Sequence, residues 1–140
     1  MKRFQHPAMW MIDICDEPSA LDMPYLGELA ARFNREIPAV SAYVNLYPNY
    51  AQVSWNKGGQ VLSQLGTTNY AEHIAVYCRT APLHYITYDH YPYNDDAKVT
   101  LNRHMPQMYG NFNIVAQACR RTGRTFWYAP QVNTDRRAHV

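Results

Sequence analysis

The sequence predicts an α/β fold built from parallel (β/α) units, four strands and three helices, in a single domain over residues 1–140. Two observations support this prediction. Four short apolar segments, rich in aromatic and β-branched residues, alternate with three segments of helical periodicity. The strands begin near residues 9, 41, 83 and 125, at intervals of 32, 42 and 42 residues, about one (β/α) unit each. Such alternation favours crossover connections and a parallel sheet.

The predicted strands are bounded by Pro, Gly, Asn or Asp, as strands usually are, and cover residues 8–15, 39–46, 83–89 and 125–129. The first predicted helix, 24–36, repeats apolar residues at helical spacing, with Asp22 as its expected N-cap. The second, 69–79, is expected to be capped by Thr67 or Thr68. The third, 107–121, ends in two arginines before Gly123, a C-terminal pattern that suits the helix dipole.

The two longest connections, 48–66 and 91–105, each follow a strand and precede a helix, so they lie at the carboxyl end of the sheet. Proteins of this class bind ligands there. Four (β/α) units amount to half of an eight-stranded barrel, which typically takes about 250 residues. Half a barrel leaves two strand edges uncovered. We therefore expect a fragment of a longer catalytic domain, a chain that self-associates through open barrel edges, or an open sheet.

Composition excludes several functions. The net charge of +2 argues against a polybasic nucleic-acid or membrane surface, and no run of 18 apolar residues is present. Residues 1–7 lack the apolar core of a signal peptide, which leaves the compartment open. Cys15, Cys78 and Cys119 are odd in number and lack CxxC spacing, so we expect buried thiols rather than disulfides or a zinc site.

Two acidic residues are candidate catalytic groups. Glu17 closes the first strand before Pro18, among aromatic side chains, where desolvation raises the pKa of a carboxyl and suits it to proton donation. Asp89 ends the third strand at the equivalent height, two strands away. Each also has a purely structural interpretation, as a cap or as a turn-forming residue. Asp89 with His90 lacks the spacing of a metal site, so no metal or cofactor is expected.

Amides and aromatic rings cluster at the same strand ends. Sugars require this mixture, because rings stack on their C–H faces while amides bond their hydroxyls; strand-end turn chemistry is the alternative interpretation. The expected substrate-binding residues are Asp16, Asn45, Tyr47, Asn49, His90, Tyr91, Trp127 and Gln131. No G-x-S-x-G elbow or phosphate-binding loop is present.

Three segments, 6–10, 16–20 and 43–51, resemble glycoside-hydrolase TIM barrels of the β-galactosidase-like clan. Leu65-Gly66 with Tyr70, then 88–92 and 123–127, extend the resemblance over most of the chain, corresponding to the central and C-terminal part of a barrel. In that clan the general acid/base is a Glu in an Asn-Glu-Pro-like context at the fourth strand, and Glu17 matches it, with Asp16 in place of Asn.

The same resemblance implies a nucleophilic Glu at the end of the seventh strand, which falls near Gln131, and no glutamate follows Glu72. Either the nucleophile belongs to sequence outside this chain, or Asp89 substitutes for it as the second carboxylate, or catalysis has been lost. The expected function is a glycoside-hydrolase-like domain that acts on or binds carbohydrate. The alternatives are a non-catalytic or vestigial carbohydrate-binding half-barrel and an unrelated open-sheet α/β domain.

Overall fold

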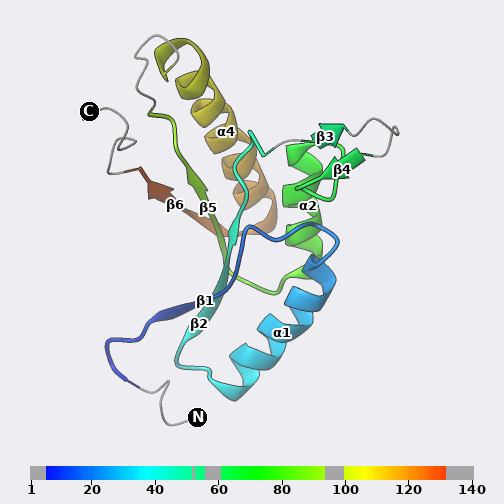
Figure 1. The fold of residues 1–140 in the computed structure, drawn as a ribbon. Coiled ribbons are helices and arrows are strands. Elements are labelled where there is room, and N and C mark those ends of the chain that lie inside the picture. Colours follow the sequence, from blue (N-terminus) through cyan, green and yellow to red (C-terminus); the bar gives the residue numbers. More distant parts are fainter. Residues whose placement is uncertain (1–5, 52, 56–60, 94–99, 132–140) are drawn as a thin grey trace, which may run out of the picture.

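The computed structural model describes residues 6–51, 53–55, 61–93 and 100–131. Its fold is α/β, with a four-stranded parallel sheet and three α-helices, resembling half of a (β/α)₈ barrel (Figure 1). The elements in chain order are β1 (Met11–Asp16), α1 (Met23–Glu36), β2 (Ser41–Leu46), β3 (Val53–Trp55), β4 (Val61–Ser63), α2 (Tyr70–Thr80), β5 (Tyr85–His90), the π-helix η2 (Thr100–His104), α4 (Met105–Thr122) and β6 (Thr125–Pro130).

The sheet has the order β1-β2-β5-β6, so β1 and β6 form its edges. Every neighbouring pair is parallel, and all four strands therefore end at the same side of the sheet. In the register, Asp16 pairs with Asn45, and Asn45 with Thr87. The three α-helices lie on one side of the sheet (Figure 1).

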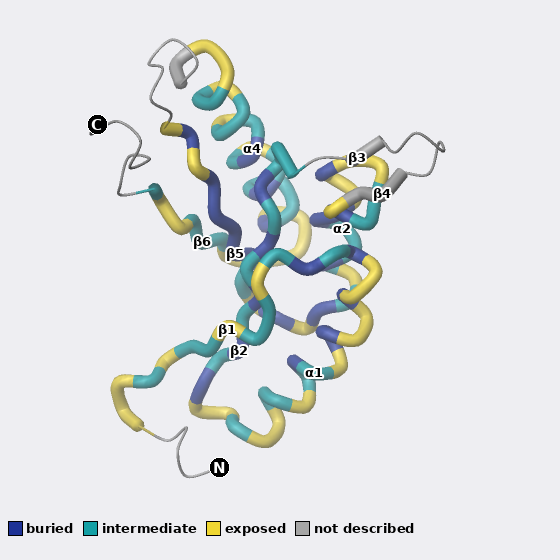
Figure 2. The backbone as a smooth tube through the Cα atoms, viewed as in Figure 1, coloured by how far each residue is buried: buried dark blue, intermediate teal, exposed yellow. Residues whose placement is uncertain are grey.

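The core lies between the sheet and the helices. Strand β2 shows why: Ala42, Val44 and Leu46 are buried, while the residues between them are only partly buried. This alternation turns one face of the strand toward the helices. Strands β2 and β5 are the most buried, and the edge strands β1 and β6 are more exposed (Figure 2).

Helix α1 packs closely on the end of α2. A Cβ placed on Gly27 of α1 would lie 2.1 Å from the backbone oxygen of Thr80. Only glycine permits this approach, because atoms at that distance overlap. The helix predicted over residues 24–36 is confirmed as α1. Its Gly27 has a packing role that periodicity alone does not reveal.

Of the two predicted N-caps, the one of α1 is confirmed by position and the one of α2 is wrong. Asp22 occupies the N-cap position of α1, but its side chain makes no capping hydrogen bond. Helix α2 is capped by Asn69 rather than by Thr67 or Thr68, because the Asn69 Oδ1 accepts from the backbone N–H of Glu72 at 2.9 Å. The end of α4 is as predicted: Gly123 is its C-cap, in the left-handed conformation with φ 68°.

The segment 48–66, expected to be a plain loop, contains an antiparallel hairpin of β3 and β4. The hairpin lies beside the start of α2 (Figure 1). Three-residue strands are too short for a periodic signal, which explains why the pattern missed them. All three cysteines are free, Cys119 buried and the other two partly buried. None of the helices within the described residues has the length and apolar character needed to cross a bilayer.

Candidate functional site

Glu17 is held at the carboxyl end of β1 in an unusual backbone conformation. Its φ of 48° lies in the left-handed region, and no other non-glycine residue of the described ranges has a positive φ. Its N–H donates to the backbone oxygen of Asn45 at 2.7 Å, which fixes it beside β2. A non-glycine residue in this region costs about 1 kcal/mol, and such strain concentrates at functional sites.

Asp89 lies near the carboxyl end of β5 and is only 6% exposed. Its Oδ1 is buried and has no hydrogen-bond partner among the described residues. A hydrogen bond from the Tyr91 hydroxyl to the Asp89 carboxylate raises the pKa of Tyr91, because ionised Tyr91 would face a negative charge. A buried carboxylate oxygen without a donor is costly, so this position favours a ligand or water that supplies one.

The charge of Asp89 acts on Glu17. Burial raises the pKa of Glu17 above its ordinary value, and the negative charges of Asp89 and then Asp16 raise it further. Strands β1 and β5 both neighbour β2, so their backbones lie about 10 Å apart at the usual strand spacing. Two carboxyl groups therefore lie at the same end of the sheet, and the pKa of one of them, Glu17, is raised.

Asn45 joins the two neighbouring strand ends. Its Nδ2 donates to Asp16 Oδ1 at 2.9 Å, so Asp16 accepts from a neighbouring strand beside Glu17. Tyr47 follows β2 and packs partly against the core, with its ring centroid 6.2 Å from that of His73. Of these three expected substrate-binding residues, Asp16 and Asn45 lie beside Glu17. Tyr47 packs toward α2, and its pKa is raised by burial and then by the charge of Glu17.

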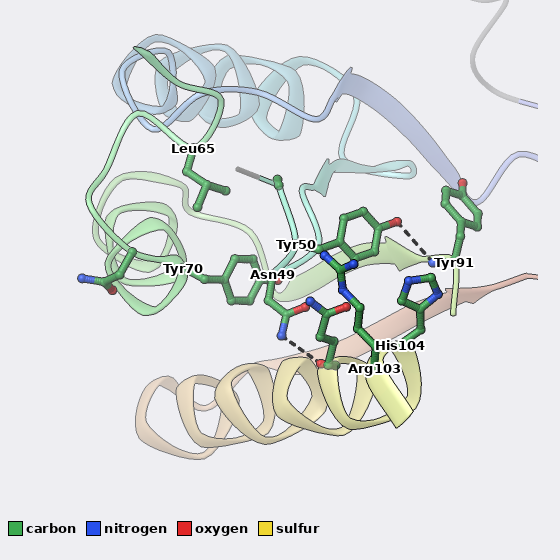
Figure 3. Close-up of a pocket in the computed structure, with 10 residues that line it drawn as sticks. Asn49, Tyr50, Leu65, Tyr70, Tyr91, Arg103 and His104 are labelled. Carbon is green, nitrogen blue, oxygen red and sulfur yellow. Dashed lines mark hydrogen bonds between the residues drawn. The ribbon is translucent and has the colours of Figure 1, made fainter. Parts of the chain in front are cut away.

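A cavity of ≈ 660 Å³ opens between the loops that follow β2 and β5 and the η2–α4 segment (Figure 3). Asn49 and Tyr91, both expected from the sequence, line it together with Tyr50, Arg103 and His104. Tyr50 connects the two loops, because its hydroxyl accepts from the Tyr91 N–H at 3.3 Å. Burial raises the pKa of Tyr50, and the charges of Asp89 and Glu17 raise it further, so this ring lies near both carboxylates.

The floor of this region is organised by Asn111 of α4, which is fully buried. Its Oδ1 accepts from the Asn49 N–H at 2.7 Å, and its Nδ2 donates to the Tyr70 hydroxyl at 2.9 Å. His90 Nδ1 lies 3.3 Å from the same Oδ1. Since an amide oxygen only accepts, His90 carries its proton on Nδ1 and leaves Nε2 as an acceptor.

The His90 side chain is buried rather than exposed to a substrate. It is 0% exposed, and its Nε2 is buried without a partner among the described residues. Burial lowers its pKa, which favours the neutral ring. The side chain of His90, the last residue of β5, therefore points toward α4 rather than toward the open face of the sheet. Side chains alternate between the two faces along a strand, so Asp89 and His90 point to opposite faces.

Trp127 and Gln131 occupy different environments. Trp127 lies on the sheet face opposite the helices, with Trp10 at 4.9 Å and Tyr85 at 5.0 Å between ring centroids, and it lines a hollow of ≈ 500 Å³. Gln131 braces the loop after β5, because its Oε1 accepts from the Tyr93 N–H at 2.9 Å and its Nε2 donates to the Tyr93 oxygen. The Gln131 amide is thus engaged by backbone.

Sequence reasoning missed Tyr50, Arg103, His104 and Asn111. Tyr50 directly follows Asn49, and its position in the long loop after β2 was the available signal. Arg103 and His104 precede the predicted start of the third helix, and Asn111 falls inside it as a polar residue at a buried position. Within the described ranges no three His, Cys, Asp or Glu side chains form a group that could hold a metal ion.

Comparisons with protein-family models, with curated protein sequences and with solved structures find no match to this chain.

Proposed function

We propose that this chain is a carbohydrate-active α/β domain of glycoside-hydrolase type, with Glu17 as its general acid/base. The observation that carries the proposal is the placement of Glu17 and Asp89 at the carboxyl ends of β1 and β5, where Glu17 is held in a strained conformation and its pKa is raised by burial and then by the Asp89 charge. Glycoside hydrolysis uses a pair of carboxyl groups on either side of the scissile bond, one protonated and one ionised. The raised pKa of Glu17 suits it to the role of the proton donor.

In the proposed reaction, the protonated Glu17 donates its proton to the glycosidic oxygen as the C–O bond breaks and the sugar develops oxocarbenium character. Asp89 is the second carboxylate. In a retaining enzyme it forms a bond to the anomeric carbon at a carboxyl separation of about 5–5.5 Å, and ionised Glu17 then removes a proton from the water that releases the sugar. In an inverting enzyme, with a separation of about 6.5–9.5 Å, Asp89 instead activates the water directly.

The resemblance to β-galactosidase-like glycoside hydrolases agrees with Glu17 but not with the residue expected at the end of β6. Gln131 stands near the position of the expected nucleophile, and its amide bonds the backbone of Tyr93. This observation favours a second candidate function, a non-catalytic domain that binds carbohydrate with the same strand ends. An unrelated open-sheet α/β domain is the remaining alternative.

Turnover of a panel of aryl glycosides distinguishes these functions. We expect native protein to release the aryl group and Glu17→Gln to lose about 10²–10⁴-fold in rate, the usual contribution of general acid/base catalysis. Glu28→Gln is the matched control, because Glu28 is an exposed residue of α1. Sugar binding without turnover would replace the catalytic proposal by the binding domain, and turnover that is unchanged in Glu17→Gln would refute the role of Glu17.

A further inference from the structure

The cavity beside the carboxylate pair has a size suited to one or two sugar rings. Its volume of ≈ 660 Å³ falls within the range of small-molecule sites, about 300–1,000 Å³. Tyr50 and Tyr91 line it and are joined by the hydrogen bond of 3.3 Å between the Tyr91 N–H and the Tyr50 hydroxyl, and Tyr91 follows Asp89 by two residues at the end of β5. A ligand in the cavity therefore adjoins the proposed reaction centre.

The charge of the residues that line this cavity is positive. Arg103 lines it, and none of the described lining residues is acidic. Figure 3 shows the Arg103 side chain extending from the start of the helix toward Tyr50. No ion pair of Arg103 occurs within the described part of the chain. A guanidinium presents several donors in a planar arrangement that matches a carboxylate.

Two further groups are suited to sugar hydroxyls. Asn49 Oδ1 is buried without a donor among the described residues, while its Nδ2 is occupied by the Gln107 oxygen at 2.8 Å. The Tyr70 hydroxyl accepts from Asn111, which leaves its own proton available. One unpaired acceptor and one available donor, beside a cation, match a sugar that carries both hydroxyl groups and a carboxylate.

We propose that this cavity binds an acidic sugar residue, a uronic acid, next to the cleaved bond, with Arg103 holding its carboxylate and Asn49 Oδ1 accepting from a hydroxyl. The inference rests on the proposed carbohydrate function and names its substrate class. Without Arg103, the neighbouring Glu17 and Asp89 would repel such a ligand, so the guanidinium decides the preference.

Calorimetric titration of the full chain with oligogalacturonides and oligoglucuronans, each beside its carboxyl-reduced form, tests the inference at 0.15 M salt. The reduced form keeps the hydroxyls and linkage and replaces only the carboxylate by a neutral alcohol. We expect the acidic form to bind about tenfold or more tightly, as a charge-assisted arginine–carboxylate pair implies. Arg103→Gln should abolish this difference, and Arg120→Gln, an exposed arginine in the last turn of α4, should preserve it.

Equal binding of acidic and reduced glycans, or an acid preference that survives Arg103→Gln, would overturn the acidic-sugar inference and leave the carbohydrate function standing. Failure of every glycan, acidic or neutral, to bind would instead count against the carbohydrate function itself and remove the basis of the inference.

Discussion

Replacing Asn111 by leucine tests how the cavity floor is held together. Asn111 is 0% exposed and joins three parts of the chain, through Asn49 after β2, Tyr70 of α2 and His90 of β5. Leucine has the same number and branching of side-chain heavy atoms and no polar atom, so Asn111→Leu removes the hydrogen bonds without opening a cavity. It leaves one N–H, one imidazole nitrogen and one hydroxyl without their partner.

The expected loss follows from what those three groups can do next. A buried polar group left unpaired costs about 1–3 kcal/mol. Asn49 and Tyr70 line the cavity and can bond to water there, which puts them at the low end, whereas His90 has no such access. Allowing for the added apolar burial, we expect the free energy of unfolding to fall by about 3 kcal/mol, or the Tm by about 10 °C.

Urea unfolding followed by circular dichroism measures this difference, with the slope of the transition checked for constancy. Asn113→Ala is the control, because Asn113 is exposed on the same helix and bonds only Gln117. Its change should stay within about 0.5 kcal/mol. A loss below about 1 kcal/mol in Asn111→Leu, comparable with the control, would refute the role assigned to Asn111.

Three other predictions concern packing, pH and assembly. Gly27→Ala should lower the free energy of unfolding by about 2–3 kcal/mol, because its Cβ would overlap the Thr80 oxygen. Gly110→Ala should raise it by about 0.5–1 kcal/mol, because its Cβ would meet Asn49 Nδ2 at an ordinary contact distance of 3.5 Å. Equal effects of the two substitutions in urea unfolding would contradict the close contact between α1 and α2. Because the pKa of Glu17 is raised in the folded protein, the contribution of Glu17 to stability is full below its ordinary pKa of 4.5 and falls as the pH rises through the folded pKa. Glu17→Gln should therefore raise the Tm at pH 7 but not at pH 4. An equal shift of the Tm at both pH values would contradict this prediction. We also propose that the open edges of β1 and β6 lead the chain to self-associate; sedimentation equilibrium should detect dimers at tens of micromolar, and a monomer at every concentration would count against it.

The fold was predictable because its main elements are long and periodic. The alternation of apolar strands with amphipathic helices requires crossovers, and the observed sheet has parallel neighbours throughout. Local features were less predictable. The cap of α2 depends on which of three adjacent polar side chains reaches the Glu72 N–H, and Asn69 does so at 2.9 Å. The β3–β4 hairpin pairs two segments too short to carry a pattern.

The candidate site was predictable to the level of strand ends. Parallel strands place their carboxyl ends together, so Glu17, Asn45 and Asp89 could be assigned to one region. The direction of each side chain was not available in the same way, because adjacent residues of a strand face opposite sides. His90 is the clear example, since it turns to Asn111 while Asp89 does not. Arg103 escaped notice because its position depends on how the connection after β5 folds back.

The pKa of Glu17, measured by carboxyl-carbon NMR titration in native protein and in Asp89→Asn, tests the central pairing of two carboxyl groups most directly. We expect a native pKa above 4.5 that falls when the Asp89 charge is removed, because that charge raises the pKa of Glu17. A native pKa at the ordinary value, unmoved by Asp89→Asn, would contradict the pairing on which the proposed carbohydrate chemistry depends.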